Sequence, residues 1–324
     1  MNPAAGRDIR RLTGGASVSS NYAKRRAAIC VLEGLTAVAE PIRVSVMPDG
    51  AGVSASVFEH APEGLTVREL DQPVTGSATD TRRAAERLRE VADVVVVLGG
   101  DGTNRDVASE VGDVPVASVS TGTNNVVPTP IDGTPAGAAA ALVATDAIPA
   151  DEVTLRHGMV EARVEGRAGD ETVRGLASVG LSRRSFVGTR ATLDPSELLG
   201  GVVSRAGPGE IGLSGVAGAL ASHPADAPGG VGLRLGPTTE TPRTARAIVV
   251  PGVVARLGVA ECRYLDDEAE MTFEVEEGVV TVDGERELEV QDATVRLRPV
   301  ADGPRLVAFD RVFEAVARER CFQG

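Results

Sequence analysis

Hydrophobic positions in the first half of the chain alternate between two periodicities. Residues 94–98 form a continuous apolar run, and residues 114–119 are again rich in valine. Such runs are typical of strands buried on both faces of a parallel sheet. Before the first run, residues 79–91 repeat apolar side chains at the spacing of one helical face, and Thr134-Pro135 opens an Ala-rich helix that runs to about residue 145. This alternation of strands and helices predicts a Rossmann-like parallel α/β domain over residues 1–148.

The pattern changes after about residue 150, where short strand-like stretches are separated by Gly and Pro. The expected strands are 159–164, 245–250, 271–275, 279–282, 287–290 and 293–297. Such punctuation predicts an antiparallel, β-sandwich-like C-terminal domain over residues 149–306. Residues 307–324 are expected to form a closing helix that packs back on the first domain. The Gly-rich stretch 199–218 is neither strand nor obvious linker, and we place it at the cleft between the domains.

The charge of the chain indicates the environment of the protein and restricts its partners. Net charge is -13, and Lys24 is the only lysine among 33 basic residues. An acidic surface with arginine in place of lysine favours a halophilic protein, whose self-repulsion is screened over about 3 Å at 1 M salt. A GC-rich genome is the alternative explanation. The acidic balance argues against nucleic acid as a partner, because backbone binding needs a basic face.

Other sequence signals point to a protein of the cytoplasm. No apolar run approaches the roughly 18 residues that span a bilayer, and the N-terminus lacks the apolar core of a signal peptide. We therefore expect no membrane partner and a cytoplasmic location. The three cysteines are scattered, and no side-chain cluster predicts a metal site.

The scarcity of lysine also restricts the chemistry. A P-loop and a protein kinase both need a lysine at a fixed place, and Lys24 lies in neither context. ATP chemistry in this chain must therefore use backbone N–H groups, arginine and Mg²⁺. The loop after residues 94–98 suits that requirement, since its glycines allow positive φ and its N–H groups open a helix. Its expected phosphate-binding residues are Gly99, Gly100, Gly102, Thr103, Asn104 and Arg105.

Asp101 lies in the middle of this loop, where a pure phosphate site would disfavour a carboxylate. We interpret it as a base for a substrate hydroxyl or as a metal contact. The alternative is an ordinary tight turn between a strand and a helix. A second loop, after residues 114–119, supplies hydroxyl and amide donors suited to phosphate or ribose oxygens. Its expected ligand-binding residues are Thr121, Gly122, Thr123, Asn124 and Asn125.

Two loops of this kind, GGDGTN and STGTNN after neighbouring strands, resemble the ATP-NAD kinase and diacylglycerol kinase superfamily. The segments at 2–11, 186–191 and 209–214 are similar to its acetoin-catabolism protein X branch, which is NAD-kinase-like. The pair Asp283 and Glu285 resembles a late Asp-Gly-Glu hairpin of the superfamily, although Asp-Gly is also a common hairpin turn. Further possible site residues are Asn2, Arg7, Gly212 and Ser214.

The resemblance implies a nucleotide cleft between the two domains and a role in NADP biosynthesis. By it, Asp101 activates the 2′-hydroxyl of NAD(H) for attack on the γ-phosphoryl group of ATP, with Mg²⁺, and the chain forms a homo-oligomer. Two departures stand out. Ala177-Ser178 replaces an Asn-Glu pair that holds the dinucleotide, and the Asn-Pro segment begins at residue 2, where a complete strand is expected before it. The alternatives are a kinase for another hydroxyl, lipids included, and an inactive nucleotide-binding regulatory protein.

Overall fold

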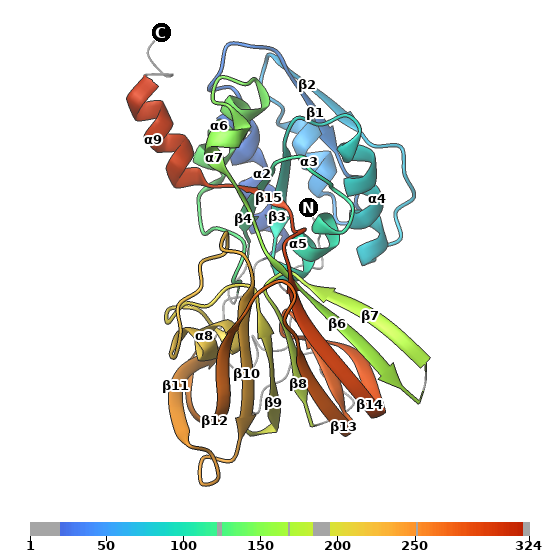
Figure 1. Cartoon of the computed structure of the whole chain (residues 1–324). Helices are drawn as coiled ribbons and strands as arrows, with labels where there is room; N and C mark the ends of the chain where they lie inside the picture. The colour runs from blue at the N-terminus through green and yellow to red at the C-terminus, as the bar shows by residue number, and fades with distance from the viewer. Residues whose placement is uncertain (1–19, 122–124, 168, 184–194, 251, 320–324) are drawn as a thin grey trace.

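The computed structural model describes residues 20–121, 125–167, 169–183, 195–250 and 252–319. Figure 1 shows an N-terminal α/β part above a large antiparallel sheet, with the end of the chain returning to the N-terminal part. The expected fold class, a parallel α/β domain followed by a β-rich domain, is confirmed. No helix in the described ranges is long and apolar enough to cross a membrane.

The N-terminal part contains two separate parallel arrangements of strands. Its strands are β1 (Ile42–Val46), β2 (Leu65–Glu69), β3 (Val95–Gly99) and β4 (Val116–Ser120). Its helices are α2 (Asn21–Leu35), α3 (Val53–Glu59), α4 (Ala78–Arg89), α5 (Asp101–Ala108), α6 (Gly133–Ala144) and α7 (Ala150–Val153). β1 pairs with β2, and β3 pairs with β4, both in parallel. The carboxyl ends of β3 and β4 therefore carry the two predicted loops at the same edge.

The chain crosses into and out of the N-terminal sheet near residues 155 and 306. β5 (Thr154–Arg156) and β15 (Arg305–Val307) extend that sheet in the order β3-β4-β15-β5. The closing helix α9 (Phe309–Glu319) buries Phe309, Val312 and Ala315 in the core that α2 and α6 also form. We retain the division into 1–148 and 149–306, with 307–324 packed back, as a proposal. β5 and most of β15 fall within 149–306 by number, but both strands pair in the N-terminal sheet.

The C-terminal part is one continuous sheet of nine strands in the order β11-β12-β10-β9-β8-β13-β14-β6-β7. The strands are β6 (Met159–Gly166), β7 (Gly169–Gly175), β8 (Ser178–Ser182), β9 (Leu198–Val203), β10 (Gly230–Gly236), β11 (Arg243–Val250), β12 (Val253–Leu265), β13 (Met271–Val282) and β14 (Glu285–Val300). A short 3-10 helix, η1 (Pro195–Glu197), precedes β9, and the helix α8 (Gly212–Gly218) packs on β8 to β11. The β-rich domain is therefore a single hydrogen-bonded sheet.

The Gly-rich stretch 199–218 includes a strand that its composition concealed. β9 pairs with β8 on one side and β10 on the other, so it is central in the sheet. A Cβ atom on Gly200 would lie 2.1 Å from the carbonyl oxygen of Leu233, and one on Gly201 would lie 2.4 Å from that of Val179. Glycine is required here because the neighbouring backbones approach closely. The expectation that this stretch is not a strand is wrong for its first part.

Candidate functional site

The first predicted loop is the junction where β3 ends and α5 begins. Gly100 caps the helix with an extended backbone, and Asp101 is its first residue. A Cβ atom on Gly99 would lie 2.7 Å from Cβ of Thr103, and one on Gly100 would lie 2.8 Å from Oδ1 of Asn125. Close packing therefore requires these glycines. The expectation of positive φ is wrong, because Gly99, Gly100 and Gly102 all avoid that region.

Asp101 connects this loop to the chain that follows the second loop. Only 7% of the residue is exposed. Its carboxylate accepts hydrogen bonds from the N–H of Val126 at 2.9 and 3.1 Å and from the N–H of Val127 at 2.9 Å. Bonds to an ionised acceptor are stronger than those between neutral groups. Asp101 therefore holds the two loops in a fixed relation.

The second predicted loop lies beside the first at the end of β4. The N–H of Thr121 donates to the carbonyl of Gly99 at 3.4 Å, and Nδ2 of Asn125 donates to Oγ of Ser120 at 2.7 Å. Oγ1 of Thr121 is buried, and no described residue forms a hydrogen bond with it. A buried hydroxyl of this kind is suited to a ligand oxygen. The remaining predicted residues of this loop, Gly122, Thr123 and Asn124, lie outside the described residues.

Asn104 supports the first loop from inside the protein. It is 2% exposed, its Nδ2 donates to the carbonyl of Gly100 at 2.9 Å, and its Oδ1 accepts from Oγ of Ser118 at 2.6 Å. These bonds fix the start of α5 against β4. Asn104 was predicted to bind phosphate, but its side chain lies behind the loop and bonds to Gly100 and Ser118.

Arg105 extends from α5 to the C-terminal domain. Its Nη1 donates to the carbonyl of Val282 at 3.2 Å and lies 3.5 Å from Oδ2 of Asp283, while Nη2 lies 3.5 Å from Oε2 of Glu287. Burial of the guanidinium opposes its charge, but the carboxylates of Asp283, Glu287 and Glu285 outweigh that effect and raise the pKa of Arg105. Arg105 is therefore an ion-paired bridge between the domains.

Asp283 forms the turn between β13 and β14. Asp283 and Gly284 have φ of 50° and 80°, the positive values that two-residue hairpin turns require. The side chain of Asp283 is 1% exposed, and its carboxylate accepts from the N–H groups of Leu176 at 3.0 Å, Ala177 at 2.7 Å and Ser178 at 3.1 Å. The backbone of Asp283 forms the common hairpin turn expected for Asp-Gly. Its carboxylate holds residues 176–178, which include Ala177-Ser178.

These contacts form a closed path between the domains. Asp101 holds Val127, which packs with Leu176 and Ala177 in one apolar cluster. Asp283 binds the N–H groups of Leu176 and Ala177 and pairs with Arg105, one helical turn after Asp101. Two buried carboxylates and one arginine thus join the start of α5 to the β13–β14 hairpin. The two domains meet at a fixed junction beside the glycine loop.

Glu285 faces the start of α5 from the opposite domain. Its Oε2 lies 3.7 Å from the position that a Cβ atom of Gly102 would occupy. The N–H groups in the first turn of a helix have no acceptor within the helix, and they attract anions. The site therefore combines anion-binding N–H groups on one side with carboxylates on the other. An anionic ligand that binds here needs a cation beside it to offset the repulsion from the carboxylates.

The remaining predicted residues lie in α8 or outside the described ranges. Gly212 begins α8 with a φ of 65°. Ser214, in the same helix, is 1% exposed, and no described residue forms a hydrogen bond with its Oγ. Asn2 and Arg7 lie outside the described residues. Within the part of the chain that the structure describes, no group of three His, Cys, Asp or Glu side chains could hold a metal ion.

Sequence reasoning missed the backbone partners of the two aspartates. The donors are the N–H groups at Val126, Val127 and 176–178. A backbone N–H group has no residue signature, so a motif cannot reveal it. The available signal was indirect, since a carboxylate in a buried loop requires donors.

Two known domain families match the two parts of the chain. Residues 20–146 match the ATP-NAD kinase N-terminal domain, and residues 158–302 match the acetoin catabolism protein X C-terminal domain. Acetoin catabolism protein X of Cupriavidus necator (strain ATCC 17699) is 34% identical over 296 residues, which are 89% of this chain and 82% of that protein.

Two solved structures are similar at low identity. Yeast NADH kinase complexed with NADH has a TM-score of 0.50 and 14% identity, covering 93% of this chain and 84% of that one. A diacylglycerol kinase from Bacillus anthracis str. Sterne has a TM-score of 0.38 and 12% identity, covering 82% of this chain and 95% of that one. The first of these likenesses concerns the fold alone.

Proposed function

The chain belongs to the acetoin catabolism protein X family, which is NAD-kinase-like, and we propose that it is a phosphotransferase that transfers the γ-phosphoryl group of ATP to the 2′-hydroxyl of NAD(H) or a related nucleotide. The observation that carries the proposal is the junction at the start of α5. There, a glycine loop after the mostly buried strand β3 faces Glu285 of the other domain. The two-domain fold, shared with an NADH kinase, supports it.

The residues have separate roles in this proposal. The N–H groups of Gly102 and Thr103 bind phosphate oxygens, and Gly99 and Gly100 let Thr103 and Asn125 pack against the start of α5 because they carry no side chain. The Thr121 hydroxyl donates to a further ligand oxygen. Phosphoryl transfer depends mainly on such positioning and charge stabilisation.

Asp101 is the proposed base. It accepts the proton of the acceptor hydroxyl as the hydroxyl oxygen attacks the γ-phosphorus, the bond to the β-phosphate oxygen breaks, and ADP leaves with the electron pair. The bonds from Val126 and Val127 fix the orientation of the carboxylate. Mg²⁺, when bound to the phosphates, neutralises their charge. Glu285 and Glu287 near the helix start fit that requirement, because phosphates beside carboxylates need a cation.

One observation favours a second candidate, a nucleotide-binding regulatory protein without turnover. Ala177 and Ser178 occupy the place expected for the dinucleotide-holding pair, and neither carries a carboxylate. Ala177 is 1% exposed, and its N–H is bound to Asp283. A hydroxyl acceptor other than NAD(H) is also compatible with this difference.

A kinase assay separates these candidates. Purified protein is supplied with ATP, Mg²⁺ and either NAD or NADH, at low and at molar KCl, and the 2′-phosphorylated product is quantified. We expect product, and a loss of about 100-fold in rate for Asp101→Asn, the usual size of a general-base effect. Asp106→Asn is the matched control, since Asp106 is equally buried in α5 but pairs with Arg82 at 2.9 Å.

Each other outcome of this assay has a definite meaning. Saturable ATP binding by calorimetry without product from either dinucleotide would exclude the NAD kinase and leave the regulatory protein or a kinase for another hydroxyl. Full activity in Asp101→Asn would remove Asp101 as the base. Sedimentation of the same sample tests the further expectation of a homo-oligomer.

A further inference from the structure

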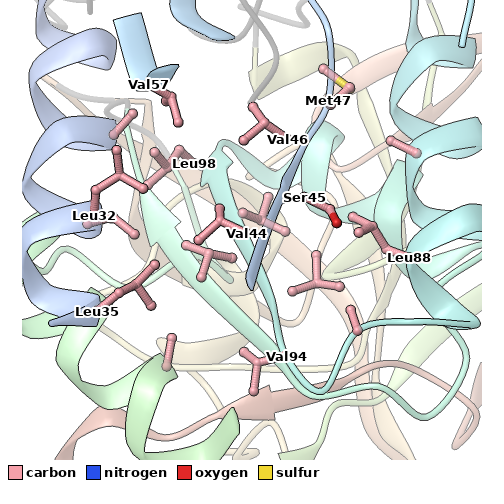
Figure 2. A pocket seen from close by; sticks show the side chains of 18 of the residues that line it. Leu32, Leu35, Val44, Ser45, Val46, Met47, Val57, Leu88, Val94 and Leu98 are labelled. Atoms are coloured by element: carbon pink, nitrogen blue, oxygen red, sulfur yellow. The ribbon is translucent and has the colours of Figure 1, made fainter. Parts of the chain in front are cut away.

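A cavity of about 610 Å³ lies inside the N-terminal domain, and its lining residues all fall between Ala28 and Thr145. Its walls are mainly apolar, and the side chains labelled in Figure 2 are apolar apart from Ser45. A charged group that leaves water needs an opposite charge or hydrogen-bond donors around it. The phosphate groups of a nucleotide acceptor are therefore better matched by the arginines at the domain junction than by this cavity.

Two arginines lie near residues 176–178 at that junction, and they differ in the donors they have left. Arg105 reaches this segment through Asp283, which binds its N–H groups. Nη1 of Arg105 donates to the carbonyl of Val282, and Nη2 donates to Glu287. The Arg105 side chain is only 14% exposed. A phosphate contact from Arg105 would therefore require its contacts between the domains to break.

The second arginine, Arg205, follows the residue that binds the carbonyl groups of the same segment. That residue is Ser204, which lies just after β9. Its N–H donates to the carbonyl of Ala177 at 3.0 Å, and its Oγ donates to that of Leu176 at 2.9 Å. Arg205 is thus fixed beside the place where the resemblance led us to expect a dinucleotide-holding pair.

A buried histidine provides a second indication that Arg205 lies at the junction. Burial lowers the pKa of His157 to about 4, the charge of Arg205 lowers the same pKa further, and the carboxylate of Asp283 opposes both effects. The Arg205 guanidinium and the Asp283 carboxylate therefore both lie close enough to act on one ring.

The guanidinium of Arg205 keeps most of its donors free. Its Nε is paired with Oε1 of Glu210, a side chain that is 13% exposed. No described residue forms a hydrogen bond with Nη1 or Nη2 of Arg205, and 37% of this side chain is exposed. The planar fork of an arginine matches two oxygens of a phosphate group. Glu210 thus fixes one end of the guanidinium, and the two Nη groups stay available to a ligand.

We propose that Arg205 binds a phosphate group of the acceptor, and that the acceptor is therefore a hydroxyl compound that carries phosphate. The proposal rests on the phosphotransferase function proposed above, in which the loop at 99–103 binds the phosphates of ATP. Ala177-Ser178 offers no carboxylate to the hydroxyl groups of an acceptor. Arg205 selects the acceptor by its charge instead. An uncharged acceptor, such as a diacylglycerol, would leave the Arg205 fork without a partner.

Arg205→Gln tests the proposal, with Arg263→Gln as the matched control. Arg263 is 48% exposed, and its Nε is also paired with a glutamate, Glu261, at 2.9 Å. Arg205→Gln should raise KM for NAD by about 10- to 100-fold, the effect of a lost hydrogen bond to a charged group, and leave KM for ATP within about 2-fold. Arg263→Gln should change neither value.

A second variant separates the phosphate contact from an effect on folding. Arg205→Gln leaves the Glu210 carboxylate without its partner, so the double variant Arg205→Gln/Glu210→Gln is measured as well. It should show the same rise in KM for NAD with an unchanged melting temperature. A KM for NAD that returns to the original value in the double variant would overturn the proposal, because the orphaned carboxylate would then explain the loss.

Adenosine provides the chemical control, because it carries ribose hydroxyl groups without a phosphate. Measured as an inhibitor, it should bind Arg205→Gln as tightly as the unaltered chain. An equal loss of affinity for adenosine and NAD, or an unchanged KM for NAD, would overturn the proposal. If the chain forms no product, calorimetry of NAD binding makes the same comparison. An affinity for NAD that depends on Arg205 then upholds the phosphate contact although the kinase function has failed, and an absence of NAD binding overturns both.

Discussion

Two aspartates of the C-terminal sheet provide a matched pair of substitutions that tests the junction between the domains. Asp283 and Asp292 both have left-handed backbones, with φ of 50° and 46°, a conformation that Asn also adopts readily. The side chain of Asp283 is 1% exposed, whereas that of Asp292 is 63% exposed and lies 3.9 Å from Arg167. Replacement by Asn therefore changes the carboxylate without straining the backbone in either case.

The expected magnitude follows from the hydrogen bonds. The Asp283 carboxylate accepts three backbone N–H groups, and an amide in its place must turn its NH₂ toward at least one of them. Each bond to a charged acceptor contributes about 1.5–3 kcal/mol, and the ion pair with Arg105 is lost as well. Asp283→Asn should lower the free energy of unfolding by about 2–4 kcal/mol. Asp292→Asn should change it by less than about 0.5 kcal/mol.

The assay combines urea unfolding, followed by circular dichroism, with amide exchange. Exchange at residues 176–178 should accelerate by at least about 30-fold in Asp283→Asn, which corresponds to about 2 kcal/mol. It should stay unchanged in Asp292→Asn. Equal stability of the two variants, or unaltered exchange at 176–178, would refute the assignment of Asp283 as the anchor of the junction.

Further predictions concern acidity, the glycine loop and salt. Burial lowers the pKa of His157 to about 4, so the unfolded chain binds a proton below pH 6.5 that the folded chain does not. Stability should be complete above pH 6.5 and fall by up to about 1.4 kcal/mol per pH unit toward pH 4, and His157→Leu should flatten the slope between pH 6.5 and 5 in urea titrations. Gly102→Ala should raise the melting temperature, since Ala is favoured in helices by about 1 kcal/mol, yet weaken ATP binding in calorimetry; unchanged affinity would remove Gly102 from the phosphate site. Gly100→Ala should lower the melting temperature because of its contact with Asn125, and a tolerated Ala would contradict the close packing. With a net charge of -13, the protein should melt at higher temperature in about 2 M than in about 0.1 M KCl, and a decrease would count against the halophilic interpretation.

The parallel strands were predictable because burial on both faces leaves a continuous apolar run. Residues 94–98 and 114–119 correspond to β3 and β4. The long antiparallel strands were harder to predict from the sequence. The two expected strands 271–275 and 279–282 form one strand, β13, and the two expected strands 287–290 and 293–297 form one strand, β14. Their interruptions stay in the ladder, with Glu277 opposite Gln291 and Gly278 opposite Val290. Polar and glycine positions within a paired strand cannot be distinguished from turns without knowledge of the partner strand.

The candidate site was predictable where a side chain or glycine carries the signal. The loop at 99–103 stands out because three glycines and an aspartate follow a buried strand. The position of Asp101 against Val126 and Val127 could not be deduced, because it depends on how the second loop returns past the first. The same holds for Arg105 and Asp283, which are far apart in sequence and meet only through the arrangement of the two domains.

A crystal structure of the protein with Mg²⁺ and a non-hydrolysable ATP analogue would test the proposed phosphate site at the start of α5. The proposed site predicts phosphate oxygens within hydrogen-bonding distance of the N–H groups of Gly102 and Thr103, with the nucleotide between α5 and the β13–β14 hairpin. Nucleotide phosphates bound elsewhere, with the start of α5 occupied only by solvent, would contradict it.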